Sequence, residues 1–327
     1  MKKRVLSGNR PTGKLHIGHF HGALKNWIKL QDEYDCFFFV ADWHALTTNY
    51  DNVVALKSDI QEMVIDWLAL GLDPQKSVIY KQSDIPEVAE LSLYLSMITP
   101  LGWLERCPTY KEQLQELKEK DIATHGFLGY PVLQAADILI VHSDFVPVGE
   151  DQLPHLELSR EIARRFNYLY GDCFSEPQAL LTEVKRLPGI DGRKMSKSYG
   201  NAIFLSDSPD EIRNKVRMMI TDPQRIKLTD KGHPEVCTVF AVHKAYSQDV
   251  LEDIEAQCRG ATRGCTECKG ILAEKIAESL TGFREKRAKL VKEPEIVQKV
   301  LKNGANQTRP IAQDALHEVR KRMNIGV

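Results

Sequence analysis

Three short apolar segments, each followed by a stretch with helical character, most constrain the fold of this chain. They are RVLSG (4–8), the apolar run within DCFFFVADWHAL (35–46), and SVIYKQS (77–83). Between the first two, KLHIGHFHGALKNWIKLQDEY (14–34) spaces its apolar residues as an amphipathic helix does. Strands that alternate with helices form a parallel sheet with helices on both faces. We therefore predict an α/β fold whose site lies at the carboxyl ends of the strands, where a helix N-terminus can meet phosphate.

The second half of the chain has a different character, because from about residue 206 the pattern is helical with little strand character. Residues 103–121 indicate a polar helical insertion before it. A last helix is expected to begin near Pro310, since proline suits a first helical turn and the basic residues 320–322 suit a helix end. We expect one domain over 1–205, a helical domain over 206–307, and a last helix at about 308–327 that packs back on the first domain.

Composition excludes some classes of protein. The 327 residues are 43% hydrophobic and 27% charged, which is ordinary for a globular protein. The first residues lack the apolar core of a signal peptide, and no stretch approaches the roughly 18 apolar residues of a membrane span. We expect a cytoplasmic protein with no membrane partner. The net charge is −5 over residues 1–200 and +4 over 201–327, a weak indication that the C-terminal part meets an anion.

Two glycine-rich polar segments are candidates for chemistry. The first, GNRPTGKLHIGH (8–19), places His16 and His19 three residues apart, so both lie on one helix face. The second, DGRKMSKSYG (191–200), carries Lys194 and Lys197 between glycines. Either segment alone also fits a solvated polar surface. Lysine binds phosphate as a point charge, and glycines let a loop close over a substrate, so the pair together favours a polyphosphate site.

The strings LHIGH (15–19) and KMSKS (194–198), in this order, resemble the paired signature of class I aminoacyl-tRNA synthetases. Within that class, residues 129–167 resemble the tryptophanyl-tRNA synthetase family over nearly their whole length, and the similarity extends from residue 4 to the last helix. The resemblance implies a Rossmann-like catalytic domain, a C-terminal helical domain that contacts the anticodon, and a homodimer. It also implies three substrates, which are L-tryptophan, ATP with Mg²⁺, and tRNA(Trp).

The implied chemistry agrees with the residue types. In amino-acid activation a carboxylate attacks the ATP α-phosphate and pyrophosphate leaves, so no general base is needed and positioning and charge stabilisation carry catalysis. The expected catalytic residues are Lys194 and Lys197, holding pyrophosphate most tightly in the transition state, with His16 and His19 against the phosphates. The ATP-binding residues that the resemblance implies are Asn9, Arg10, Pro11, Thr12, Gly18, His19, Gly149, Glu150, Asp151, Leu187, Lys194, Met195, Ser196, Lys197 and Ser198.

The expected amino-acid pocket centres on Asp137, which interrupts an otherwise apolar helical segment. Indole offers a donor and no acceptor, so a buried carboxylate is its natural partner. Tyrosine-specific relatives usually have a tyrosine in the first strand, where this chain has Leu6, whereas Gln134 is more typical of the tyrosine enzymes. The residues expected to bind tryptophan are Leu6, Gly8, His44, Tyr130, Gln134, Asp137, Val146 and Val148.

Three alternatives remain open at this point. The nearest is a tyrosyl-tRNA synthetase. A small-molecule adenylyltransferase with the same first turn would not need a basic helical domain. A non-catalytic paralogue of a synthetase is disfavoured by the intact motifs.

Four cysteines in the C-terminal part form a second candidate site, with the spacing C-x20-C-x6-C-x2-C. They are Cys237, Cys258, Cys265 and Cys268. Four thiolates are a complete ligand set for zinc or for a [4Fe–4S] cluster, and the alternative is separate core cysteines without a metal. Only one CxxC pair is present, which favours the cluster over a zinc ribbon, and some members of the family resemble this pattern and carry [4Fe–4S]. Arg259, Arg263 and Lys269 are then expected to contact tRNA phosphates around it.

Overall fold

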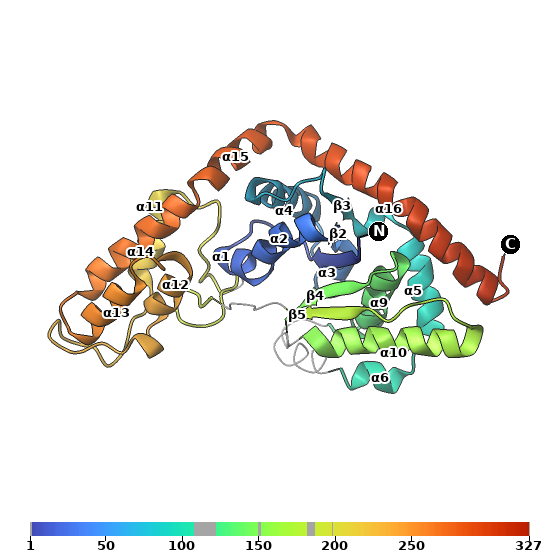
Figure 1. Ribbon diagram of the computed structural model, residues 1–327, viewed down its shortest axis with the longest axis horizontal. Helices are drawn as coiled ribbons and strands as arrows, with labels where there is room; N and C mark the ends of the chain where they lie inside the picture. The colour runs from blue at the N-terminus through green and yellow to red at the C-terminus, as the bar shows by residue number, and fades with distance from the viewer. Residues whose placement is uncertain (1, 108–121, 150–151, 182–186, 198, 327) are drawn as a thin grey trace.

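A parallel five-stranded sheet forms the centre of the N-terminal part in the computed structural model, which describes residues 2–107, 122–149, 152–181, 187–197 and 199–326 (Figure 1). The strands are β1 (Arg4–Asn9), β2 (Asp35–Val40), β3 (Ser77–Lys81), β4 (Phe145–Val148) and β5 (Gln178–Leu181). Their order is β3-β2-β1-β4-β5, with every neighbouring pair parallel. The predicted α/β parallel fold is confirmed. Strand β5 was not predicted, because QALL is short and has no fully buried residue.

The helices of this part connect the strands and cover the sheet. They are α1 (Ile17–His19), a π-helix (Phe20–Leu24), α2 (Lys25–Glu33), α3 (Asp42–Asn49), α4 (Leu56–Leu70), a 3-10 turn (Gln82–Asp84), α5 (Glu87–Ile98), α6 (Leu101–Glu105), α8 (His125–Leu128), α9 (Tyr130–Ile140) and α10 (Leu153–Tyr170). The helix expected over 14–34 is thus three consecutive segments with a π-helical centre. Residues 108–121, most of the expected polar insertion, lie outside the described part of the chain.

Alternate side chains of the strands point to two separate hydrophobic cores. Val5 and Phe38 belong to the first core, where Trp27 of α2 stacks on Phe38 at 4.6 Å between ring centroids. Leu6 and Phe39 belong to the second core, together with residues of α5, α9 and α10. Because helices cover both faces of the described sheet, its strand ends are where the sheet can meet a ligand.

The C-terminal helices gather at the far end of the molecule and return to the sheet (Figure 1). They are α11 (Pro209–Met218), a 3-10 turn (Pro234–Val236), α12 (Thr238–Tyr246), α13 (Leu251–Arg259), α14 (Cys265–Ser279), α15 (Thr281–Lys292) and α16 (Pro294–Arg322). Helix α15 runs from this group past α4, and α16 continues along the sheet-bearing part. Within the described residues, no helix combines the length and the apolarity that crossing a bilayer requires.

Helix α16 begins at Pro294, so the expected start near Pro310 was wrong. Pro294 occupies the first turn, and Pro310 lies inside the helix, where it removes one helical hydrogen bond. Tertiary packing outweighs that cost, because α16 lies directly on β3. At Gly304 an added Cβ would come within 1.9 Å of the Ile79 carbonyl oxygen, so only glycine permits this approach.

Candidate active site

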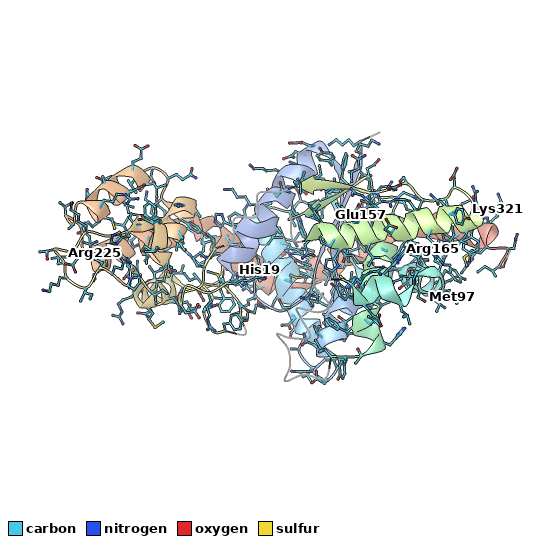
Figure 2. The ribbon with its side chains drawn as sticks, turned by 90° about the horizontal axis from the view of Figure 1, so that it is seen from below. His19, Met97, Glu157, Arg165, Arg225 and Lys321 are labelled. Carbon is cyan, nitrogen blue, oxygen red and sulfur yellow. The ribbon has the colours of Figure 1, made fainter. Side chains whose placement is uncertain are left out.

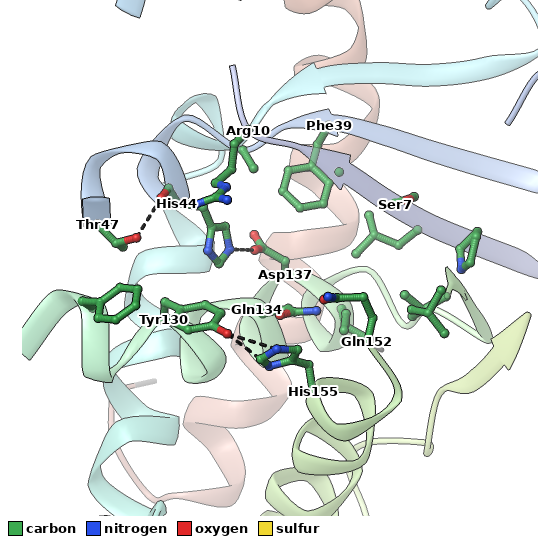
Figure 3. A pocket seen from close by; sticks show the side chains of 18 residues that line it. Ser7, Arg10, Phe39, His44, Thr47, Tyr130, Gln134, Asp137, Gln152 and His155 are labelled. Carbon is green, nitrogen blue, oxygen red and sulfur yellow. Dashed lines mark hydrogen bonds and ion pairs between the residues drawn. The ribbon is translucent and has the colours of Figure 1, made fainter. Parts of the chain in front are cut away.

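A cavity of about 300 Å³ opens at the carboxyl ends of β1, β2 and β4 (Figure 3). Its wall is formed by the strand ends, by α3 and α9, and by the start of α10. All eight residues expected to bind tryptophan line it: Leu6, Gly8, His44, Tyr130, Gln134, Asp137, Val146 and Val148. Arg10, expected to bind ATP, lines it too. Nine other lining residues were missed by the sequence reasoning: Ser7, Phe39, Ala41, Thr47, Phe127, Ile138, Pro147, Gln152 and His155.

Asp137 is the carboxylic acid at the base of this cavity, with 1% of its surface exposed. His44 Nε2 lies 2.8 Å from Asp137 Oδ2, and Gln82 Nε2 donates to both carboxylate oxygens at 2.9 Å. Burial raises the pKa of Asp137 above its ordinary value, while the hydrogen bonds from His44 and Gln82 act in the opposite direction. A carboxylate has about four acceptor positions, so Asp137 has capacity for one more donor inside the cavity.

Tyr130 and His155 form a second polar group in the wall. The Tyr130 hydroxyl lies 3.1 Å from His155 Nε2 (Figure 3). Cys107 Sγ lies 3.5 Å from His155 Nδ1. His155 and Cys107 are both buried. This contact chain orients the Tyr130 hydroxyl at the cavity surface. Nothing in the sequence around His155 distinguished it from other polar residues of an amphipathic helix.

His16 and His19 lie against each other at the start of α1, with ring centroids 3.6 Å apart. The His19 backbone N–H donates to His16 Nδ1 at 3.3 Å, and the His16 N–H donates to His19 Nδ1 at 3.2 Å. Burial, and after it the nearby positive charges, lowers the pKa of His16 to about 3 and that of His19 to about 4. Both rings are therefore neutral at pH 7. Since each Nδ1 accepts a hydrogen bond, each neutral ring carries its proton on Nε2 and offers one N–H donor.

Gly18 fits between these rings and the lysine loop. An added Cβ at Gly18 would lie 2.9 Å from His16 Nδ1 and 3.6 Å from the Cβ of Met195. Met195 is buried, so the loop that carries both lysines packs directly on the first turn of α1. Two motifs about 180 residues apart are thus in contact.

The lysine loop is anchored at its base by Asn201, which is 1% exposed. Asn201 accepts from Ser196 N at 2.8 Å and donates to Asp191 at 2.7 Å and to the Lys194 carbonyl at 3.1 Å. Lys197 Nζ donates to the Thr12 carbonyl, and burial, opposed by Asp59, lowers the pKa of Lys197. The loop therefore brings its cations to the turn that follows β1.

The other expected ATP residues fall into two groups. Asn9, Pro11, Gly149 and Leu187 are described and none of them lines the cavity, whereas Glu150, Asp151 and Ser198 lie outside the described residues. Asn9 ends β1, and its carbonyl accepts from Ala41 N at 2.9 Å. Gly149 follows β4, next to the cavity wall formed by Pro147 and Val148.

The four cysteines line one small apolar cavity of about 20 Å³ among the C-terminal helices: Cys237, Cys258, Cys265 and Cys268. All four are free thiols. Burial, and after it the neighbouring thiols, raises the pKa of Cys268 to about 12. Arg225 Nη1 lies 3.9 Å from the sulfurs of Cys258 and Cys265 (Arg225 is labelled in Figure 2). In the described part of the chain, no three His, Cys, Asp or Glu side chains have the spacing of a metal centre.

Comparison with known proteins agrees with this geometry. The family model of tRNA synthetases class I (W and Y) matches residues 1–281. The fold, the paired motifs and this match define a class I aminoacyl-tRNA synthetase, which is an ATP-dependent ligase.

Individual relatives narrow the class. A tryptophan–tRNA ligase from Thermotoga maritima is 51% identical, covering 98% of this chain and 99% of that protein. One from Aquifex aeolicus is 47% identical over 98% of this chain and its own full length. A crystal structure of tryptophanyl-tRNA synthetase from Campylobacter jejuni, complexed with ADP and tryptophan, is 35% identical with a TM-score of 0.88, and 98% of this chain and 100% of that chain are covered. The chain belongs to the tryptophan–tRNA ligase family, and the tyrosine alternative is not favoured.

Proposed function

We propose that the cavity holds L-tryptophan and that the two motifs beside it activate its carboxylate with ATP, before transfer to the 3′ end of tRNA(Trp). The observation that carries this proposal is Asp137, a buried carboxylate with a free acceptor position in a cavity otherwise rich in apolar walls. The indole N–H donates to Asp137, while His44 and Gln82 fix the carboxylate in place. Leu6 places an apolar side chain at the β1 position where tyrosine-specific relatives usually have a tyrosine.

The two motifs, where they contact each other, carry out the phosphate chemistry in this proposal. The amino-acid carboxylate attacks the α-phosphate, and Lys194 and Lys197 attract the departing pyrophosphate. Lys197 exchanges its hydrogen bond to Thr12 and its electrostatic attraction to Asp59 for phosphate oxygens. The neutral rings of His16 and His19 donate Nε2–H groups. Mg²⁺ accompanies ATP in this family, and Gly149, Glu150 and Asp151 are proposed to bind the ribose and adenine.

One assay, pyrophosphate exchange, tests both the tryptophan pocket and the phosphate site. Exchange of labelled pyrophosphate into ATP should require L-tryptophan and should not be supported by L-tyrosine. Exchange with tyrosine alone would contradict the assignment of Asp137. Exchange without any amino acid would instead indicate a small-molecule adenylyltransferase.

The C-terminal part is proposed to bind the tRNA. We assign catalysis to residues 1–205 and anticodon contact to the helices within 206–307, with the returning helix joining the two. The net charge of +4 over 201–327 supports an anionic partner on this side. Arg259 is one of the residues expected to contact tRNA phosphates, and its side chain is 50% exposed. Arg259→Ala should weaken tRNA binding without changing pyrophosphate exchange, and a loss of exchange would contradict this division of labour.

A homodimer is also proposed. Leu93 and Met97 are 54% and 66% exposed and lie four residues apart on α5, and Leu101 at the start of α6 is 65% exposed (Met97 is labelled in Figure 2). An apolar face of this kind suits a second copy of the chain. Sedimentation should give a dimer that Met97→Glu dissociates, whereas a wild-type monomer at micromolar concentration would exclude it.

For the four cysteines we propose a [4Fe–4S] cluster, with zinc or no metal as the alternatives. Its support is the donor set, because all four thiols line one apolar cavity. The described thiols do not have the spacing of a metal centre, so a cluster would require the four sulfurs to move closer together. Such a cluster would hold α12, α13 and α14 together. Anaerobically purified protein should be brown with about four irons per chain. One zinc in a colourless preparation, or no metal, would replace this proposal.

A further inference from the structure

Asp66 is a buried carboxylate that the proposed chemistry does not use. It lies on α4 with 0% of its surface exposed. Its Oδ2 accepts from the backbone N–H of Leu15 at 2.9 Å, and its Oδ1 accepts from Nε of Arg287 on α15 at 2.8 Å. One carboxylate thus joins the turn before His16 to α15. Figure 1 shows that α15 comes from the C-terminal group of helices.

The Leu15 N–H matters because it fixes where the first turn of α1 begins. On one side the turn is held by backbone hydrogen bonds from Leu205 N to the Leu15 carbonyl at 2.9 Å and from Ile17 N to the Ile203 carbonyl at 3.0 Å. On the other side Asp66 holds it. His16 is the next residue, so a shift of Leu15 moves both stacked histidines.

Arg287 favours the charged form of Asp66 against the effect of burial. Burial raises the pKa of Asp66, while the hydrogen bonds from Leu15 and Arg287 oppose this shift. Arg287 also bonds to Glu62, one turn earlier on α4, and its side chain is only 14% exposed. Without the guanidinium, Asp66 would be a buried charge with one backbone partner, and it would take up a proton or turn away.

The same helix meets the lysine loop one turn before Glu62. At Gly13 an added Cβ would lie 2.7 Å from Asp59 Oδ1 and 3.2 Å from Lys197 Nζ. Helix α4 therefore supports both halves of the phosphate site, Asp59 on the lysine side and Asp66 on the histidine side.

We infer that Arg287 is a positioning residue for amino-acid activation, which acts through Asp66 on the turn that carries His16 and His19. This inference rests on the proposed role of that turn in ATP chemistry. It gives the C-terminal helices a direct mechanical link to the activation site, because α15 is continuous in sequence with α14 on one side and α16 on the other.

The test measures pyrophosphate exchange by Arg287→Gln and Asp66→Asn in the full chain. A displacement of about 1 Å in a catalytic group costs on the order of 100-fold, so kcat should fall about 10- to 100-fold. KM for tryptophan should stay within about twofold, because neither residue lines the cavity. Arg284→Gln is the matched control on the same helix, since Arg284 bonds to Ala277 and Thr281 and should leave kcat unchanged.

Chemical rescue separates positioning from a general loss of structure. Millimolar methylguanidinium should restore a substantial part of kcat to Arg287→Ala and none to Asp66→Asn. If circular dichroism shows that Arg287→Ala is unfolded, Arg287→Lys is compared with the wild type instead. Lysine keeps the positive charge and loses the forked geometry of the guanidinium.

Two results would overturn the inference. One is a set of folded variants with wild-type kcat. The other is a lower kcat together with a higher KM for tryptophan, with no rescue by methylguanidinium. Absence of tryptophan-dependent exchange in the wild type would refute the proposed function instead.

Discussion

Replacing Asp137 by asparagine tests the recognition of the indole ring with little change of shape. The variant keeps one acceptor oxygen and loses the negative charge. In the wild type that charge is held by His44 at 2.8 Å and by Gln82 at 2.9 Å, both from buried or nearly buried side chains. The new amide N–H₂ group would face these donors or the indole N–H, so one hydrogen bond of the set is lost.

The expected magnitude follows from the charge and burial of the acceptor. A hydrogen bond to a charged group contributes about 1.5–3 kcal/mol. At about 1.4 kcal/mol for each factor of ten, tryptophan affinity should fall roughly 10- to 150-fold. Since Asp137 lies away from the lysine loop, kcat for pyrophosphate exchange at saturating tryptophan should change by less than about threefold.

An analogue gives the assay its internal control. In β-(3-benzothienyl)alanine a sulfur replaces the indole N–H, so the wild-type protein should bind it about as weakly as Asp137→Asn binds tryptophan. The variant should bind both compounds nearly equally, because the two changes remove the same interaction. Equal affinity of the wild type for tryptophan and for the analogue would refute the role given to Asp137.

Other predictions concern the phosphate site. Lys197→Ala should lower kcat for exchange by about 100-fold or more while tryptophan affinity is kept, and a loss confined to tryptophan affinity would contradict the pyrophosphate role. Gly18→Ala should lower kcat at least tenfold in a folded protein, because its Cβ would lie 2.9 Å from His16 Nδ1; full activity would show that the stacked rings can shift freely. The pKa values of about 3 for His16 and about 4 for His19 mean that the unfolded chain takes up these protons below about pH 6.5 while the folded chain does not. Stability should therefore fall as pH drops from 6.5 to 4, with a smaller slope in His19→Asn, and an unchanged slope would show that these rings are charged in the folded protein.

The sequence predicted the parallel sheet and the eight cavity residues because local pattern and resemblance both pointed to strand ends. It could not predict Gln82, which reaches Asp137 from a 3-10 turn 55 residues earlier. A glutamine after a strand has no periodic or motif signal, and only the sheet order brings β3 near α9. The predicted helix start near Pro310 was wrong for a related reason. Proline is typical of a first helical turn, but the packing of α16 on β3 keeps this helix continuous through Pro310.

The close contact between Gly304 and Ile79 also has a consequence for the order in which this protein is made. More than 200 residues separate β3 from the helix that covers it. At about 5–20 residues per second, that interval on the ribosome lasts roughly 10–40 seconds. Throughout it, the edge strand β3 lacks the helix that packs against its backbone at Ile79, so one edge of the nascent sheet stays uncovered. Completion of this domain waits for nearly the last helix to leave the exit tunnel, and chaperone demand should be highest in that interval.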